Sequence, residues 1–225
     1  MTRDAVLDFS REDRIGLPEA IFCQGKTPAQ ISAILDASVG NIEAVLLTRL
    51  SPQALESLDE THRTAIDYDP LSKTGFWGRP PAPQGNGNVA VLTAGTSDLG
   101  PAREAARTLA FGGETVTEIA DVGVAGLWRL MERLEEVRRH PVVIVAAGME
   151  GALFSVVGGL VGSVVIALPT SQGYGVASGG RVAVNSALAS CAPGIAAVNT
   201  DNGYGAACIA LRVLGAMPSR EPPQS

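Results

Sequence analysis

Short aliphatic runs alternate with longer amphipathic segments along the chain from residue 88 onward. An aliphatic run of four to eight residues between turn residues is typical of a buried strand, and apolar residues at every third or fourth position are typical of a helix. The alternation predicts right-handed βαβ crossovers and a parallel sheet sandwiched by helices. The predicted strands are Val89–Thr93, Thr115–Ile119, Val142–Ala146, Val164–Leu168 and Ile195–Val198, and the predicted helices are Pro101–Leu109, Leu127–Arg139, Ala152–Leu160, Val182–Ser190 and Ala206–Leu214.

A smaller α/β pattern precedes the Pro/Gly-rich run of residues 79–87, with predicted strands at Glu19–Cys23 and Asn41–Thr48. Thr27-Pro28 and Ser51-Pro52 each place a capping hydroxyl before a proline, so each pair predicts the start of a helix. The expected organisation is a small α/β domain (1–78), a linker (79–87), a larger α/β domain (88–217) and a disordered tail (218–225).

Composition agrees with this fold class and limits the partners. Of 225 residues, 46% are hydrophobic but only 4% aromatic, and 26 are glycine, which suits aliphatic strands packed closely between helices. The net charge of −6 without any Lys/Arg cluster argues against a nucleic-acid partner, although a small anion needs only a few local donors. Three cysteines without a C-x-x-C pair fit a reducing compartment, and the charged N-terminus lacks the apolar core of a signal peptide, so we expect a cytoplasmic protein.

The stretch from Val142 to Leu168 is apolar enough to imitate a membrane span, but Glu150 and several glycines interrupt it. Two buried strands around a helix of small residues explain it better, so no membrane partner is expected. The helix predicted over residues 152–160 has no charged residue, and Ser155 is its only polar one. A helix apolar on all sides must be covered on all sides, and a sheet covers one face, so we predict a homo-oligomer.

Polar and glycine-rich clusters follow all five predicted strands of the larger domain. The carboxyl ends of parallel strands meet at one edge of a sheet, where helix N-termini present free N–H groups to an anion. We therefore expect one binding site at this edge. The candidate substrate-binding residues are Gly95, Thr96, Ser97, Asp98, Asp121, Gly148, Met149, Thr170, Ser171 and Asp201.

Several of these candidates also have a purely structural interpretation. Asp98 or Ser97 would cap the helix predicted at Pro101, and the same N–H groups would serve a phosphate or carboxylate. Glu150 is either an acid that favours a helix dipole, or a general acid/base or a group that orients a nucleophile. Gly25-Lys26-Thr27 resembles the end of a P-loop, but residue 20 is alanine where that motif requires glycine. We reject a nucleoside-triphosphatase and keep Lys26 as a candidate phosphate contact.

The three cysteines differ in predicted environment. Cys23 lies in an apolar strand and is expected to be a buried small hydrophobe. Cys208 lies near the start of the last helix, where the dipole lowers a thiol pKa, whereas Cys191 lies at a helix end, where the dipole opposes a thiolate. Helix position alone therefore selects Cys208 as nucleophile, although one nearby cation would reverse this choice.

Several motifs, in order along nearly the whole chain, resemble the LarB family, whose C-terminal domain is similar to the PurE aminoimidazole-ribonucleotide carboxylases and mutases. The motifs are Leu17–Phe22, Gly25–Thr27, Leu47–Leu50, Thr93–Asp98, Asp121–Gly126, Ala147–Leu153, Pro169–Gly175, Ser190–Gly194 and Val198–Gly203. The resemblance implies carboxylation of nicotinic acid adenine dinucleotide at C5 of the pyridinium ring, with CO2 or bicarbonate, and cleavage of the phosphoanhydride. The products would be pyridinium-3,5-biscarboxylic acid mononucleotide, a precursor of the nickel-pincer cofactor, and AMP.

The resemblance also assigns roles to residues. It places the nucleophilic thiol at Cys191 in Ser190-Cys-Ala-Pro-Gly194, against the helix-dipole argument, and we follow it because a pyridinium facing the thiol would stabilise the thiolate. Glu150 is the expected proton donor or acceptor. Mg²⁺ is expected to offset charge at the phosphoanhydride, although no metal-ligand cluster is visible in the sequence. PurE-like domains form octamers, so the expected oligomer is an octamer.

Two alternatives remain open from sequence. The first is a PurE-type carboxylase or mutase, which carries a histidine in the loop after the third strand. Here that loop reads Ala147-Gly-Met-Glu-Gly151, and the only histidines are His62 and His140. The second is a nucleotide-binding subunit without chemistry of its own.

Overall fold

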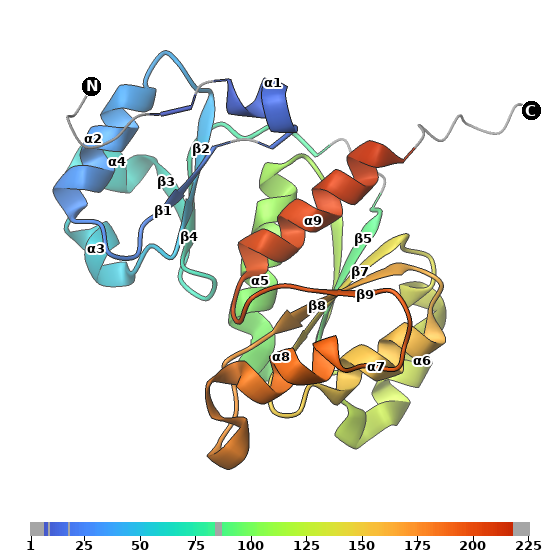
Figure 1. Ribbon diagram of the computed structural model, residues 1–225. Coiled ribbons are helices and arrows are strands. Elements are labelled where there is room, and N and C mark those ends of the chain that lie inside the picture. Colours follow the sequence, from blue (N-terminus) through green and yellow to red (C-terminus); the bar gives the residue numbers. More distant parts are fainter. Residues whose placement is uncertain (1–6, 9, 18, 84–86, 218–225) are drawn as a thin grey trace, which may run out of the picture.

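The computed structural model describes residues 7–8, 10–17, 19–83 and 87–217, which form two β-sheets and their covering helices (Figure 1). The larger sheet has the strand order β6-β5-β7-β8-β9, and all its neighbouring strands are parallel. The predicted fold class is therefore confirmed. The elements are β5 (Val89–Thr93), α5 (Leu99–Phe111), β6 (Val116–Ile119), α6 (Leu127–Val137), β7 (Val142–Ala147), α7 (Ala152–Leu160), β8 (Val164–Pro169), α8 (Arg181–Leu188), β9 (Ile195–Ala197) and α9 (Gly203–Ala216).

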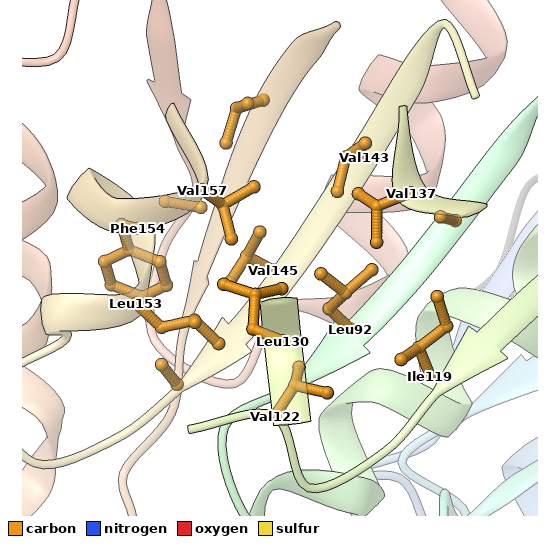
Figure 2. Close-up of a cluster of buried hydrophobic side chains, with 14 of the residues drawn as sticks. Leu92, Ile119, Val122, Leu130, Val137, Val143, Val145, Leu153, Phe154 and Val157 are labelled. Carbon is orange, nitrogen blue, oxygen red and sulfur yellow. The ribbon is translucent and has the colours of Figure 1, made fainter. Parts of the chain in front are cut away.

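Helices bury both faces of this sheet. On one face Leu109 of α5 and Ala206 of α9 are fully buried against the strands. On the other face Leu130 of α6 and Phe154 of α7 pack against Val145 of β7, as Figure 2 shows. Burial on both faces explains why the central strands β5, β7 and β8 are continuous aliphatic runs rather than alternating patterns.

The smaller sheet precedes residue 79 and is mixed, with the order β1-β2-β4-β3. Its first two strands are parallel, and β4 is antiparallel to both of its neighbours. Thr27 and Ser51 cap α2 and α3 as predicted, since their side chains accept hydrogen bonds from Gln30 N and Ala54 N. The elements are α1 (Arg11–Ile15), β1 (Ala20–Phe22), α2 (Pro28–Ser38), β2 (Ala44–Thr48), α3 (Pro52–Glu56), α4 (Glu60–Ala65), β3 (Ile66–Asp69) and β4 (Thr74–Gly78).

Some predicted ends shift, and some elements were not predicted at all. Asn41 is outside β2 because its side-chain amide donates to Ala37 O at 3.2 Å at the end of α2. Helix α9 begins at Gly203 rather than Ala206 because the Asn202 side chain accepts a hydrogen bond from Gly205 N. Helices α1 and α4 and the β3–β4 hairpin are additional. Residues 84–86 of the predicted linker and the predicted tail 218–225 lie outside the described residues, so the domain boundaries stay a prediction.

The smaller sheet packs against α5 through one aromatic and cationic cluster. The rings of Phe76 in β4 and Phe111 in α5 have centroids 5.4 Å apart. The Arg107 guanidinium carbon lies 4.0 Å from the centroid of the Phe76 ring, and its Nε donates to Thr74 Oγ1 at 2.8 Å. These contacts hold the β3–β4 hairpin against α5, the helix that follows the first strand of the parallel sheet.

Two glycines of α9 differ in how closely α5 approaches them, and this difference predicts different effects of alanine substitution on stability. A Cβ atom on Gly203 would lie 2.3 Å from Pro101 O and 2.8 Å from Ala105 N of α5, whereas one on Gly215 would have nothing within 4 Å. Gly203→Ala should therefore lower the free energy of unfolding by about 1–3 kcal/mol through overpacking. Gly215→Ala should leave it unchanged or raise it by up to about 1 kcal/mol through helix propensity. Urea unfolding of both variants checks this, and equal effects would contradict it.

Candidate active site

Loops after β5, β6, β7 and β8 enclose a cavity of about 510 Å³ at the carboxyl edge of the parallel sheet. This strand-end cleft is defined by Gly95, Asp98, Arg129, Gly148, Glu150 and Gln172. Its volume is within the range of roughly 300–1,000 Å³ typical of small-molecule sites. The structure thus brings six of the predicted site residues to one cavity, namely Gly95, Ser97, Asp98, Gly148, Met149 and Glu150.

A second cavity of about 460 Å³ adjoins the first, at the contact between the two sheets. This junction pocket is defined by Arg49, Lys73, Ser97, Glu104, Gln172 and Asp201. Ser97 and Gln172 line both cavities. Three further predicted residues line the junction pocket: Thr96, Ser171 and Asp201.

Left-handed backbone at non-glycine residues is concentrated at these two cavities. Within the described part of the chain, five such residues have φ between 52° and 59°: Arg49, Lys73, Asp121, Met149 and Asp201. Four of them line a cavity, and Asp121 pairs with Arg129, which does. Each such residue costs about 1–3 kcal/mol and persists only where its surroundings enforce the conformation. This clustering is typical of a functional site.

The loops after β7 and β8 touch through Gly148. A Cβ atom at this position would lie 2.0 Å from Gln172 O and 2.8 Å from Thr170 Oγ1. The next residue donates from Met149 N to Gln172 O at 2.7 Å. Glycine is therefore required for the close approach that forms the floor of the strand-end cleft.

Asp98 is a buried carboxyl at the base of the cleft, only 4% exposed. It accepts hydrogen bonds from Thr170 Oγ1 at 2.6 Å and from Gly95 N at 2.9 Å. Burial raises the pKa of Asp98, and nearby Asp201 acts in the same direction, although the hydrogen bonds oppose the shift. The predicted helix cap is absent, because α5 begins at Leu99 and Asp98 turns back toward the β5 loop instead.

Glu150 is exposed in the cleft, one residue before Gly151, which is the N-cap of α7. Gly151 adopts φ 64°, so the chain turns sharply between the carboxylate and the helix. Glu150 thus lies outside the first turn of α7, where the effect of the dipole is largest. This position agrees better with an acid or base that faces a ligand than with a helix-initiating acid.

Arg129 of α6 is a cleft residue that the sequence analysis did not identify. Its Nη1 forms an ion pair with Asp121 Oδ2, which places Asp121 at the same edge of the sheet as Glu150. The guanidinium offers the cleft a positive charge and planar donors suited to a carboxylate or phosphate. Its only signal in the sequence was an arginine in the first turn of a helix that follows a candidate loop.

Four predicted site residues line neither cavity: Asp121 and Thr170, which contact the lining residues Arg129 and Asp98, and Cys191 and Lys26. Cys191 is exposed just after α8, next to Ser190, whose hydroxyl is 2.7 Å from that of Ser155 on α7. It lines neither the strand-end cleft nor the junction pocket. Lys26 lies in the smaller sheet's first loop, where its Nζ donates to Phe22 O at 2.9 Å.

Burial makes the other two thiols poor nucleophiles. It raises the pKa of Cys23 to about 12, which agrees with the predicted buried hydrophobe. It also raises the pKa of Cys208, although Tyr204, Arg11 and Arg212 act in the opposite direction. Helix position therefore does not lower the pKa of Cys208, because α9 begins at Gly203 and places this thiol beyond the first turn, where desolvation dominates.

Both histidines of the chain are engaged elsewhere. His140 is buried, with Nε2 2.9 Å from Thr117 Oγ1 and Nδ1 donating to Glu136 O at 3.0 Å. His62 Nε2 lies 3.0 Å from Asp36 Oδ1 in the smaller sheet's layer of helices. Neither histidine lines the strand-end cleft.

The described residues form no ready-made protein site for the expected Mg²⁺ ion. Among the described residues, no group of three or more His, Cys, Asp or Glu side chains is placed to hold a metal. Asp98 and Asp201, the nearest candidates, already accept from Thr170 Oγ1 and Ser171 N, and Asp121 pairs with Arg129.

No helix in the described ranges is long and apolar enough to cross a membrane.

The raised pKa of Asp98 predicts a pH-dependent stability. The pKa of Asp98 is higher in the folded protein than its ordinary value of 3.8. At pH values between these two pKa values, the folded protein binds more protons than the unfolded chain. This group therefore lowers the free energy of unfolding as the pH rises. Asp98→Asn keeps an oxygen for Gly95 N–H and removes the ionisation. The difference in free energy of unfolding, variant minus wild type, should therefore increase from about pH 4 upward, by about 1.4 kcal/mol for each unit of pKa shift. Parallel stability curves in urea titrations at pH 4–7 would contradict this.

The comparisons with known proteins agree with the family resemblance that the sequence motifs indicated. The family profile of the LarB/PurE-like N-terminal domain matches residues 2–79. An uncharacterized protein of Methanocaldococcus jannaschii, MJ0165, is 37% identical over 216 residues, which cover 91% of this chain and 81% of that protein. The LarB/PurE-like match indicates a PurE-related enzyme of the carboxylase or mutase kind. The chain belongs to the LarB family.

Proposed function

We propose that this protein carboxylates C5 of the pyridinium ring of nicotinic acid adenine dinucleotide and hydrolyses its phosphoanhydride. The products are pyridinium-3,5-biscarboxylic acid mononucleotide and AMP, and CO2 or bicarbonate supplies the carbon. The observation that carries the proposal is the strand-end cleft itself. In a LarB-family chain, it combines the exposed Glu150 carboxylate, the buried Asp98 carboxyl and the Arg129 guanidinium in one small-molecule cavity.

The cleft's groups suit a ring that carries both positive and negative charge. Arg129 supplies donors for the nicotinate carboxylate, and the Ser97 hydroxyl supplies a donor for a phosphate. Glu150 offers a negative charge to the pyridinium and a base for the proton that leaves C5. The buried Asp98 holds the β5 loop through Gly95 N and ties it to Thr170.

The chemistry requires a nucleophile because a pyridinium is electron-poor and CO2 needs an electron-rich carbon. In the proposal the Cys191 thiolate adds to C4 and forms a C–S bond, which converts the ring to a dihydropyridine with enamine character at C5. C5 then attacks the carbon of CO2, its proton passes to Glu150, and the electron pair of that C–H bond restores the aromatic ring as the thiolate leaves. Water cleaves the phosphoanhydride separately and releases AMP.

The position of Cys191 makes the proposal depend on a second copy of the chain. Because Cys191 lies outside the cleft of its own chain, we propose that it faces the cleft of a neighbouring copy in a homo-oligomer. Large apolar side chains are exposed near both sites: Trp128 and Tyr174 beside the cleft are 63% and 78% exposed, and Leu188, three residues before Cys191, is 73% exposed. A contact between two different surfaces forms a ring when its rotation closes and a filament when it does not, so the expected octamer requires the closed case.

Mg²⁺ remains part of the proposal only as an ion carried by the substrate's phosphates, since the described residues form no site for it. No step above depends on it.

The rival PurE-type carboxylase or mutase is disfavoured by one observation, because both histidines lie away from the cleft and are held by Thr117, Glu136 and Asp36. A subunit without chemistry remains a distinct outcome of the test below.

Incubation with nicotinic acid adenine dinucleotide and labelled bicarbonate tests the reaction. The expected result is label in a pyridinium product together with released AMP.

The cysteine variants test the nucleophile. Cys191→Ala should abolish incorporation of label while the circular dichroism spectrum is retained, because an exposed small side chain is replaced by a smaller one. Cys208→Ala should keep most of the activity. Turnover of aminoimidazole ribonucleotide, or binding without turnover, would replace the proposal with one of its rivals, and reversed results for the two cysteines would exclude Cys191.

Mixed oligomers test whether Cys191 acts on a neighbouring cleft. Cys191→Ala and Glu150→Gln chains should each be inactive alone. Equimolar mixtures refolded together should regain about a quarter of wild-type activity per site, the statistical share of cleft–thiol pairs in which both groups are intact. Mixtures that remain inactive would show that both groups act within one chain. Light scattering at micromolar concentration provides the control: a monomer of 23.1 kDa would exclude the arrangement, and a dimer or tetramer would exclude only the octamer.

A further inference from the structure

The junction pocket combines cations from the smaller sheet with loops of the parallel sheet. Arg49 follows β2 and Lys73 lies between β3 and β4, whereas Ser97 and Gln172 belong to the loops after β5 and β8. The last two also line the strand-end cleft, so a ligand that fills the cleft can continue into the pocket.

A buried carboxylate holds Arg49 in this position. Glu104 of α5 is 4% exposed, and its Oε1 lies 3.8 Å from Arg49 Nε, while its Oε2 accepts from Gly203 N at 2.9 Å. The Arg49 guanidinium also donates to the main-chain carbonyl of Asp201. The side chain remains 34% exposed, so the guanidinium is fixed at the pocket wall with donors still open to a ligand.

Lys73 is the less constrained cation of the two. It is exposed, and its ammonium forms no hydrogen bond or ion pair with any residue that the structure describes. The hairpin tip that carries it is held close to α5, where a Cβ atom on Gly100 would lie 3.3 Å from Leu71 O. Arg107 anchors the same hairpin farther along α5 through Thr74. The scaffold therefore positions a lysine that has no partner among the described residues over a pocket that already contains an arginine.

The chemistry of the lining selects a phosphate with an attached apolar group. Arg49, Lys73 and the Ser97 hydroxyl are donors suited to phosphate oxygens. Leu71, 49% exposed, adds an apolar surface on which a planar base can lie. Thr96 and Ser171 add hydroxyls for a sugar.

We propose that the junction pocket binds the nucleoside 5′-monophosphate half of the dinucleotide, and that the smaller sheet contributes to the reaction by supplying Arg49 and Lys73. The identity of this half as AMP rests on the proposed function; the phosphate site does not. The pyridinium half then lies in the strand-end cleft, and the phosphoanhydride crosses the wall that the two cavities share at Ser97.

Binding of AMP and of adenosine to the full-length protein, measured by calorimetry, tests the proposal. Lys73→Asn removes the charge with a residue that tolerates the φ of 55° at this position. It should weaken AMP binding by about tenfold or more and leave adenosine binding unchanged, as expected for loss of a charged phosphate contact. Arg63→Gln is the matched control, because it removes one positive charge from the same part of the chain, at an exposed site outside both cavities. It should bind AMP like the wild type.

The phosphate site is excluded if the wild type does not bind AMP, if Lys73→Asn binds it within about twofold of the wild type, or if adenosine binding falls as much as AMP binding. The labelled-bicarbonate reaction separates this outcome from failure of the proposed function. AMP binding that depends on Lys73, without labelled product, supports the phosphate site and excludes the proposed reaction. Labelled product formed by Lys73→Asn with an unchanged KM for the dinucleotide supports the reaction and excludes the phosphate site.

Discussion

Burial of the three central parallel strands, β5, β7 and β8, on both faces is the constraint from which the candidate site follows. Polar side chains are costly on either face of these strands, so the polar residues gather where the strands end. Since all five strands point the same way, their carboxyl ends deliver Gly95, Gly148 and Gln172 to one edge. Helices α5 and α9 press against one another so closely that glycine is required at residue 203, and this contact fixes the loop that carries Asp201.

The stable scaffold supports a set of strained and desolvated groups at that edge. Five left-handed residues cost about 1–3 kcal/mol each, and two buried carboxyls, Asp98 and Glu104, have raised pKa values because burial disfavours their charged forms. Their compensation is local: Asp98 accepts from Thr170 and Gly95, and Glu104 accepts from Gly203 and lies beside Arg49. Sequences seldom retain such arrangements where stability alone matters, so their concentration here favours a function at the edge.

The sequence predicted the sheet well and the cavities only in part, for physical reasons. Aliphatic runs such as Val89–Thr93 identify strands buried on both faces without further information, and α7 was predicted to the residue because glycines bound its apolar run. The β3–β4 hairpin has no such pattern, since Ile66–Asp69 alternates only weakly and its stability comes from pairing with β2 and packing on α5. Arg49 was missed because its orientation depends on Glu104, a buried carboxylate far away in sequence. Arg129 was missed because it lies just beyond the motif Asp121–Gly126, and only the folded helix shows its ion pair with Asp121.

The arginines of the site are paired with carboxylates rather than gathered in a basic patch. This pairing explains how a chain with a negative net charge can form a site for an anion. The chain carries a net charge of −6, yet each cavity contains a guanidinium whose orientation is set by a carboxylate, Arg129 by Asp121 and Arg49 by Glu104. Such a pair attracts anions only at short range, because its field falls off quickly, and it loses little entropy when a ligand binds since the arginine is already oriented. Lys73 differs in having no paired carboxylate among the described residues, so it contributes the uncompensated charge of the junction pocket. An acidic protein can therefore bind a dianionic nucleotide through a few prepositioned donors, without the extended positive surface by which nucleic-acid-binding proteins are recognised.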